Sequence, residues 1–565
     1  MRILKKRGCK KEMSRISRED NLRSVPNYND HSPEALDIRA KNRKKVIADA
    51  AYTHPIIVCI PTTKQDCLSP AFKNTLEELR KINAIVVIGE DQADQETIDY
   101  LNSLAADYPN EIYVSHNDGD SVKELHQYLK DEGKKHGTEL VSDHRGKGYN
   151  MDKITSVALS ICEERFSNDQ DPIIVFCDSD VVTFDVGIVE KLAVPLIVKH
   201  QVHDYQIVKS FFTRIKDNML TGRATRLFIK PFIEALERTY GEDQLFNDFR
   251  KLEYPLSGEV AVRARTLWNI PWSTHWGAEC GFIGHISEHN IPTTQAKITN
   301  NYIHKNQSLA GGLEKMVREM TITLFDELEK RDFQLDMDKL DEIISHYKKR
   351  VNSKIYNTAY DAAVSGLDYD EQQERLAVEL FTKNMVVAAV NNLYHNGRVT
   401  LEQAETLIIG KTSCRIVPEA EVKEIYAEIN RVSDEISKRK ESGEDYSDLS
   451  EELKTWVDKS RPLVAQEWIQ TKLPKPLSSF AEKVKVCGKG LIQKVLASTL
   501  YKNGQIPKFI SANDIGDNGG EQTSSLSDEQ RRAAGINNTV VAGSADVNLA
   551  GTEAVSAPVR APHVM

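Results

Sequence analysis

Residues 172–180 have the sequence PIIVFCDSD, a short apolar run that ends in two aspartates separated by one residue. Ile, Val and Phe in an unbroken run favour a strand buried on both faces, which places Asp178 and Asp180 at its carboxyl end. Three earlier segments have a similar composition and are also expected to be strands. They are PIIVCIP (55–61), AIVVIGED (84–91) and EIYVSH (111–116).

Helical patterns separate these strands. We expect helices over 72–81, 97–108 and 153–166, and a further one over 226–240. Strands that alternate with helices predict an α/β fold with a mostly parallel, Rossmann-like sheet and right-handed crossovers. In such sheets ligands bind beyond the carboxyl ends of the strands, where the acidic residues of 84–91 and 172–180 fall.

The composition changes along the chain and suggests four parts. Residues 1–50 are polar and predict a mobile leader or a short helix, and 51–330 hold the α/β unit. Residues 331–510 show amphipathic helices, among them 376–393 and 419–439, with Thr400 and Gln403 placed as a capping box. Residues 511–565 are rich in Gly, Ala, Ser and Asn, which predicts a disordered tail.

Overall composition excludes several classes of protein. The chain of 565 residues has a formal net charge of −10, which gives no basic surface for nucleic acid. No segment approaches the ~18 uninterrupted apolar residues of a membrane span, and four lysines between 480 and 502 do not share one helical face. We therefore expect no membrane contact. Eight scattered cysteines without a CxxC pair indicate free thiols and a cytoplasmic protein.

The aspartates at the end of 172–180 point to metal chemistry. A divalent cation, Mg²⁺ or Mn²⁺, neutralises the charge that develops on a departing diphosphate when hard oxygen ligands hold it. Two carboxylates that flank one residue at a strand end bring their oxygens to one edge of the sheet. The alternative is two solvated aspartates in a turn, because a lone DxD motif is weak evidence.

Three further segments have features of anion or metal sites. Lys147 stands in the glycine-rich segment RGKGYNMDK (145–153), where glycines allow close approach to a phosphate. Gly222 to Thr225 precede a predicted helix and combine an arginine with a hydroxyl. His304 precedes a helical pattern over 309–328. The alternatives are a basic surface turn, an ordinary helix cap and a capping histidine, respectively.

Eight segments taken in order resemble one known family, the retaining glucosyl-3-phosphoglycerate synthases, which have the GT-A fold. The resemblance runs from about residue 56 to 324. Its segments are IPTTKQ, VVIGEDQADQET, RGKGYNM, VFCDSD, GRATRLFIKP, YPLSGEVAVR, HWGAECGFI and IHKNQSL. Lys64, Gln65 and Gly89 depart from the family pattern, which leaves the base and the sugar open.

The resemblance implies a role for individual residues. Those implied to bind the nucleotide-sugar donor are Pro61, Thr63, Asp91, Lys147, Asp178, Ser179, Gly258 and Glu259. Those implied to bind the phosphate of the acceptor are Arg223, Ala224, Thr225 and Asn306. Asp180 and His304 are implied as the protein ligands of the cation, and Asp180 with Glu279 as the catalytic residues. Glu279 would orient the donor sugar and the acceptor.

The resemblance therefore implies a metal-dependent retaining hexosyltransferase. Its donor would be UDP-glucose or a GDP-sugar, and its acceptor a small phosphorylated acid, 3-phosphoglycerate. Two alternatives stay open: transfer to a protein or another macromolecule, and a catalytically silent protein that binds a nucleotide sugar. The sequence also leaves the oligomeric state open, with a homodimer as one expectation.

Overall fold

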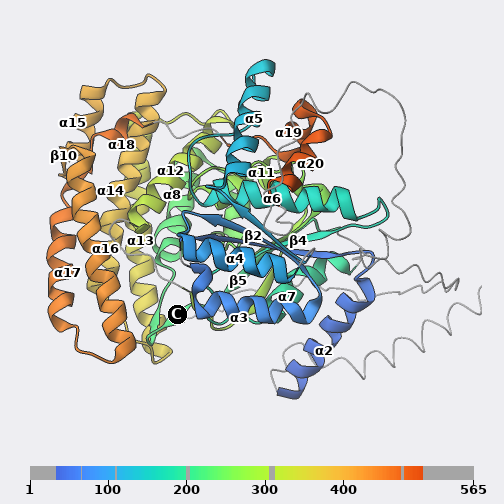
Figure 1. The fold of residues 1–565 in the computed structure, drawn as a ribbon. Coiled ribbons are helices and arrows are strands. Elements are labelled where there is room, and N and C mark those ends of the chain that lie inside the picture. The colour runs from blue at the N-terminus through green and yellow to red at the C-terminus, as the bar shows by residue number, and fades with distance from the viewer. Residues whose placement is uncertain are drawn as a thin grey trace, which may run out of the picture. The chain divides into compact units, whose positions relative to one another are not determined.

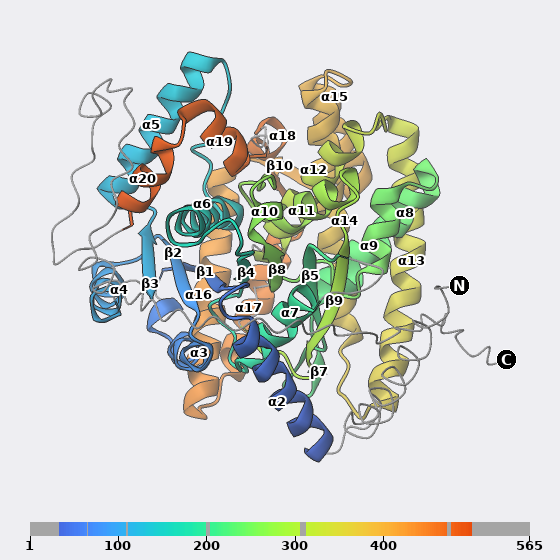
Figure 2. The same cartoon turned by 90° about the vertical axis from the view of Figure 1, so that its right-hand side faces the viewer.

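A seven-stranded sheet forms the centre of the GT-A-like part of the chain. The computed structural model describes residues 33–64, 66–108, 111–198, 204–304, 312–471 and 476–499. The sheet lies among the helices of the ribbon (Figure 1), and its strand order is β3-β2-β1-β4-β8-β5-β9 (Figure 2). β8 runs antiparallel to β4 and β5, and the other neighbouring pairs are parallel, so the predicted mostly parallel sheet is confirmed. The strands are β1 (Ile56–Thr63), β2 (Ile85–Asp91), β3 (Ile112–His116), β4 (Ile173–Phe176), β5 (Ile207–Phe212), β8 (Val260–Arg263) and β9 (Thr293–Thr299).

Helices cover both faces of this sheet (Figure 2). One face carries α2 (Pro33–Ala50), α3 (Pro70–Leu79), α4 (Gln95–Asp107) and α7 (Gly187–Ile197). The other carries α5 (Asp120–His136), α6 (Lys147–Arg165), α10 (Ala264–Leu267) and α11 (Ala278–Glu288). Because both faces are covered, the central strands are buried on both sides, which explains their continuous apolar sequences.

The four predicted strands are confirmed, but the fourth ends earlier than its sequence run. β4 stops at Phe176, so Asp178 and Asp180 lie in the loop that follows it. The sequence did not predict β5, β8, β9, α5 or α7. The 3₁₀ turns Asp66–Leu68 and Arg80–Ile82 flank α3, and β6 (Ile215–Lys216) pairs with β7 (Met219–Leu220) in a short hairpin.

Helix α6 begins at Lys147, six residues before the predicted start at 153. Glycine and asparagine are poor helix formers, which made 145–153 resemble a loop. Tertiary contacts override that preference, since the Tyr149 amide donates to Thr274 O at 3.0 Å. The Asn150 side chain also donates to Thr62 O at 3.1 Å and to Gly89 O at 2.8 Å. Lys147 is therefore in the first turn of a helix, not in a loop.

A mobile leader or a short helix was predicted for residues 1–50, and the described part of this segment is a helix. α2 spans Pro33–Ala50 and contacts α7, and Arg43 lies 3.4 Å from the buried carboxylate of Glu190. Residues 1–32 lie outside the described residues. So does the predicted tail over 511–565.

A helical region follows the sheet and shares a core with α8 (Lys230–Tyr240) and α9 (Gln244–Lys251). Its elements are α12 (Glu314–Glu329), α13 (Met337–Val364), α14 (Glu371–His395), α15 (Leu401–Thr412), α16 (Glu419–Ser442), α17 (Ser447–Ser460), α18 (Glu467–Gln470) and the strand pair β10 (Arg415–Val417) and β11 (Leu463–Ala465). The capping box of Thr400 and Gln403 is present at the start of α15. Within the described ranges, no helix combines the length and apolarity needed to cross a bilayer.

The last two described helices return to the sheet. α19 (Phe480–Cys487) and α20 (Gly490–Ala497) pack on α5 and α6 (Figure 2). Lys483 is buried and its ammonium lies 2.5 Å from Asp152 of α6, while Lys494 lies over the Tyr128 ring. These helices thus belong to the same packed layer as α6, although the sequence grouped them with the helical region.

The cysteines agree with the sequence interpretation. All seven that lie in the described residues are free thiols. Six of these are buried, and the seventh, Cys487, is half-buried.

Candidate active site

One cavity of about 390 Å³ opens at the carboxyl ends of β1, β2 and β4. This volume lies within the range of ligand pockets. It brings together every described residue that the sequence placed in the site. These are Pro61, Thr63, Asp91, Lys147, Asp178, Ser179, Asp180, Arg223, Ala224, Thr225, Gly258, Glu259, Glu279 and His304. Asn306 lies outside the described residues.

Lys147 forms ion pairs with two carboxylates in the lining of the cavity. Its ammonium lies 3.1 Å from Asp178 Oδ1 and 2.9 Å from Glu279 Oε1. Burial opposes the lysine charge, but the two carboxylates raise the pKa of Lys147 well above its usual value. Burial alone would raise the pKa of Asp178, but Lys147 and His304 outweigh it and hold the pKa below its usual value. Lys147, Asp178 and Glu279 therefore form a charged array in which the ammonium lies between the two carboxyl groups.

Glu259, the residue before β8, lines the same cavity and is buried. It accepts hydrogen bonds from the Tyr302 hydroxyl and, at 2.9 Å, from the Ser257 hydroxyl. Burial, and then the charge of Asp178, raise the pKa of Glu259 to about 7. Gly258 leaves little room beside it, because a Cβ there would stand 2.7 Å from an Asp178 oxygen and 2.9 Å from Lys147 Nζ. A larger residue at position 258 would therefore displace the charged ends of Asp178 and Lys147.

Asp180 and His304 meet although 124 residues separate them in the sequence. Val181 and His304 form an antiparallel bridge, which holds the loop after β4 against the segment after β9. His304 Nδ1 lies 3.6 Å from Asp180 Oδ2. Two ligands of one octahedral ion at about 2.1 Å stand about 3 Å apart. The oxygen and nitrogen donors therefore fit a Mg²⁺ or Mn²⁺ ion with little movement.

A second group of contacts fixes the side of the cavity near β1 and β2. Arg145 Nη1 lies 3.2 Å from Asp91 Oδ1 and 2.8 Å from Asp118. Burial raises the pKa of Asp91 even though Arg145 opposes the effect. The Thr63 hydroxyl donates to the Asp91 carbonyl at 3.0 Å. Thr63 and Asp91 are thereby held together, and Pro61 lines the same cavity.

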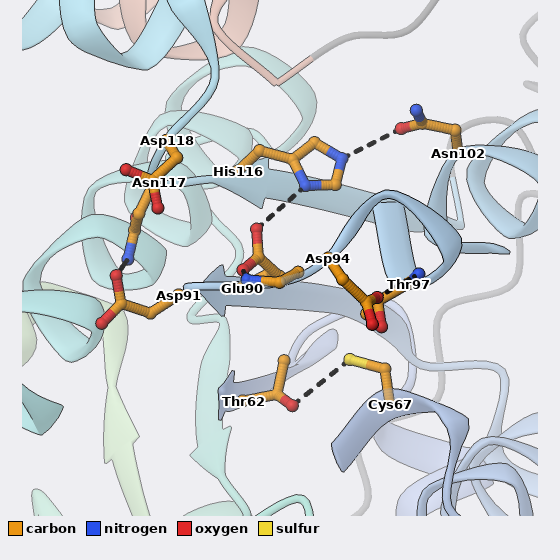
Figure 3. A network of polar contacts seen from close by, with 12 residues as sticks. Thr62, Cys67, Glu90, Asp91, Asp94, Thr97, Asn102, His116, Asn117 and Asp118 are labelled. Atoms are coloured by element: carbon orange, nitrogen blue, oxygen red, sulfur yellow. Dashed lines mark hydrogen bonds and ion pairs between the residues drawn. The ribbon is translucent and has the colours of Figure 1, made fainter. Parts of the chain in front are cut away.

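The turn that follows Asp91, the last residue of β2, has a buried support (Figure 3). Glu90 accepts the Ala93 amide with one oxygen, and its other oxygen lies 3.2 Å from His116 Nδ1. The opposite ring nitrogen of His116 lies 2.9 Å from Asn102 Oδ1 on α4. Because this chain links β2, β3 and α4, the position of Asp91 depends on buried polar contacts rather than on the turn alone.

The opposite side of the cavity holds the residues expected to bind an acceptor. Arg223 and Thr225 lie at the start of a π-helical turn (Ala224–Ile229) that continues into α8. Thr225 is 5% exposed, and its hydroxyl has no hydrogen-bond partner among the described residues. The Arg223 guanidinium contacts Glu374 and Gln373 of α14 at 2.9 and 3.1 Å. The sequence did not predict that contact with the helical region.

Several residues that line the cavity or support it were missed. Arg145 and Asn150 both belong to the segment RGKGYNM (145–151), so their closeness to Lys147 in the sequence could have identified them. Tyr302 lies two residues before His304. Trp276, Met316 and Met320 also line the cavity, and the helical pattern of α12 gave no indication that one of its faces reaches the site.

Gly148 offers a test of the packing under Lys147. A Cβ at this position would stand 1.4 Å from Ser273 O, which no side-chain rotation can relieve. We expect Gly148→Ala to lower the free energy of unfolding by about 3 kcal/mol, measured by urea denaturation. Gly410→Ala is the matched control, because its Cβ meets no described atom within 4 Å in α15. That change should stabilise by about 0.5–1 kcal/mol, and equal effects of the two would contradict the packing.

Comparison with known proteins agrees with this geometry. No family model matches the chain. The glucosyl-3-phosphoglycerate synthase of Persephonella marina is 24% identical over 334 residues, 58% of this chain and 79% of the relative. That of Methanococcoides burtonii is 25% identical over 351 residues, 60% of this chain and 82% of the relative. This chain is a GT-A glycosyltransferase that resembles these synthases.

One solved structure is similar to this chain over half of its length. It is the glucosyl-3-phosphoglycerate synthase of Mycobacterium tuberculosis in complex with Mn²⁺, uridine diphosphate and phosphoglyceric acid. The two chains are 20% identical with a TM-score of 0.36, over 50% of this chain and 82% of the other.

Proposed function

We propose that this glycosyltransferase moves a hexosyl group from a nucleotide diphosphate sugar to 3-phosphoglycerate, with retention at the anomeric carbon. One observation carries the proposal. The charged array of Lys147, Asp178 and Glu279 lies in one cavity between a predicted nucleotide side and a predicted phosphate side. The name of the two relatives supports glucose as the sugar.

Donor binding would use the side of the cavity near β1 and β2. Pro61, Thr63 and Asp91 would contact the base and the ribose, and Asp178 with Ser179 the ribose and the diphosphate. The Lys147 ammonium would stabilise negative charge on the donor, because a charge in this position needs no reorganisation during the reaction. Gly258 and Glu259 would line the sugar.

The donor set of Asp180 and His304 suits a divalent cation. When bound, Mg²⁺ or Mn²⁺ would act as a Lewis acid that neutralises charge on the departing diphosphate. Asp180 Oδ2 and His304 Nδ1 would hold it, and the bridge between Val181 and His304 keeps the two side chains close before binding. Burial of Glu259 and Tyr302 below them excludes water from that side.

Glu279 would orient the reacting groups. Its carboxylate is fixed by Lys147 at 2.9 Å, so it can accept hydrogen bonds from hydroxyls of the donor sugar and the acceptor. Arg223, Ala224 and Thr225 would hold the acceptor phosphate, which places the acceptor hydroxyl on the face from which the diphosphate leaves. The departing phosphate oxygen would accept the hydroxyl proton, so the reaction would need no protein nucleophile. Catalysis would then consist of positioning and electrostatic stabilisation.

A donor and acceptor screen tests this function. The purified protein is incubated with UDP-glucose or GDP-sugars, Mn²⁺ or Mg²⁺, and either 3-phosphoglycerate or no acceptor, and the products are separated by mass. We expect transfer to 3-phosphoglycerate well above hydrolysis of the donor. Hydrolysis that 3-phosphoglycerate leaves unchanged would remove the acceptor assignment. No turnover with any donor would favour the silent binding protein.

Arg223→Ala tests the phosphate side. A hydrogen bond to a charged group contributes about 1.5–3 kcal/mol, so the KM for 3-phosphoglycerate should rise about 30-fold. The KM for the donor should stay within about twofold, because most of the predicted donor residues lie at the ends of β1, β2 and β4, whereas Arg223 lies at the start of the turn that leads to α8. Arg250→Ala, on the exposed face of α9, is the matched control. Unchanged acceptor kinetics in Arg223→Ala would remove the phosphate-binding role.

A further inference from the structure

The helical region supplies a buried carboxylate to the acceptor side of the cavity. Glu374 lies in the first turn of α14 and is 3% exposed. Its Oε1 lies 2.9 Å from Arg223 Nε, and its Oε2 lies 2.6 Å from Arg226 Nη1. Glu374 is 151 residues from Arg223 in the sequence and outside residues 56–324, which carry the family resemblance. α14 contacts the π-helical turn and lies beside α13, which packs on α8 (Figure 1).

Arg223 and Arg226 differ in how many of their N–H donors remain available to a ligand. Arg226 uses its donors within the protein: Glu374 takes two, and Thr358 Oγ1 and the carbonyls of Thr221 and Leu220 take the others. Its role is therefore structural. Arg223 makes only two hydrogen bonds among the described residues, from Nε to Glu374 and from Nη2 to Gln373.

The Nη1 protons of Arg223 and one Nη2 proton make no hydrogen bond among the described residues, so they are available to a ligand. The planar group has five N–H donors in a rigid fork, so fixing Nε and one Nη2 proton also fixes the direction of Nη1. Arg223 lines the cavity together with Thr225, whose buried hydroxyl has no partner in the described part of the chain. An arginine and a threonine, two residue types whose donors bind phosphate, thus line the same cavity.

We propose that Glu374 is a positioning residue for the acceptor: it holds the guanidinium of Arg223 so that its remaining N–H donors face the acceptor phosphate. The proposal rests on the proposed function of Arg223. It gives the helical region a role in the reaction, which is to fix the geometry of acceptor binding. A long arginine without this support would lose side-chain entropy on binding, which weakens affinity for the acceptor and leaves the donor unaffected.

Acceptor kinetics separate positioning from a purely structural role. We expect Glu374→Ala to raise the KM for 3-phosphoglycerate about tenfold while kcat and the donor KM stay within about twofold. Glu371→Ala is the matched control, because Glu371 lies in the same helical turn and pairs with Arg375 instead. It should leave acceptor kinetics unchanged.

A double-mutant cycle shows whether Glu374 acts through Arg223. In an Arg223→Ala background, Glu374→Ala should change the acceptor KM by less than about twofold. An equal effect in both backgrounds would overturn the proposal, and so would a loss in kcat or in donor affinity as large as the loss in acceptor affinity. If Glu374→Ala does not fold, the acceptor KM is measured in Glu374→Asp instead, because aspartate keeps the charge and shifts the carboxylate. An unchanged acceptor KM in Glu374→Asp would then refute positioning.

A binding measurement distinguishes this proposal from the proposed function. Inorganic phosphate should raise the Tm of the wild type, and both Arg223→Ala and Glu374→Ala should reduce that shift. If the wild type does not transfer sugar to 3-phosphoglycerate but shows this pattern, the acceptor assignment fails and the role of Glu374 stands. If the wild type does transfer and Glu374→Ala changes neither the KM nor the Tm shift, the role of Glu374 fails alone.

Discussion

Asp180→Ala is expected to lower kcat for sugar transfer by about 10³-fold and to leave the fold intact. The side chain lies in the loop after β4, 27% exposed, so its loss opens no cavity in the core. Its Oδ2 lies 3.6 Å from His304 Nδ1, close enough for the two groups to share one divalent cation. Removing one leaves the imidazole alone to hold an ion that prefers oxygen ligands.

The measurement is kcat over a series of Mn²⁺ concentrations, together with the Tm. We expect the variant to show the wild-type Tm and an activity that excess Mn²⁺ restores only in part. Asp131→Ala, on the exposed surface of α5, is the matched acidic control and should behave as the wild type. A variant that still transfers sugar at the wild-type rate with a chelator present would refute the metal-dependent mechanism.

The strands of the sheet and the location of the site could be predicted from the sequence. β1, β2 and β4 are buried on both faces, so each is a continuous apolar run that local composition reveals. Parallel strands bring their carboxyl ends to one edge, so residues after β1, β2 and β4 had to meet there. This is why Pro61, Asp91 and Asp178 line one cavity.

Contacts between distant elements could not be predicted. Helix α6 starts at Lys147 because Thr274, from the segment before α11, accepts the Tyr149 amide, and local propensity gives no sign of this. β8 has only four residues, and β9 has the largely polar sequence TTQAKIT, so neither forms an apolar run. The contact of Arg223 with Glu374 joins residues 151 positions apart through a helix that nothing in the sequence connects with the site.

Lys147→Met should lower kcat/KM for the donor by about 10²–10³-fold. The ammonium stands between Asp178 and Glu279 at 3.1 and 2.9 Å, in a cavity where burial strengthens each interaction. Without it the two carboxylates face each other with no intervening cation, and the pKa of Asp178 loses the main influence that holds it low. The donor diphosphate would then approach two carboxylates with no cation between them.

Steady-state kinetics with varied donor, and the Tm, test this expectation. Lys147→Arg should recover only part of the activity, because a planar guanidinium presents its charge to Asp178 and Glu279 in a different geometry from the compact ammonium. Lys130→Met, which removes a surface ion pair with Asp143, is the control for loss of a lysine. Full activity in Lys147→Met would mean that the charge between Asp178 and Glu279 does not serve the donor, and the array would then be structural.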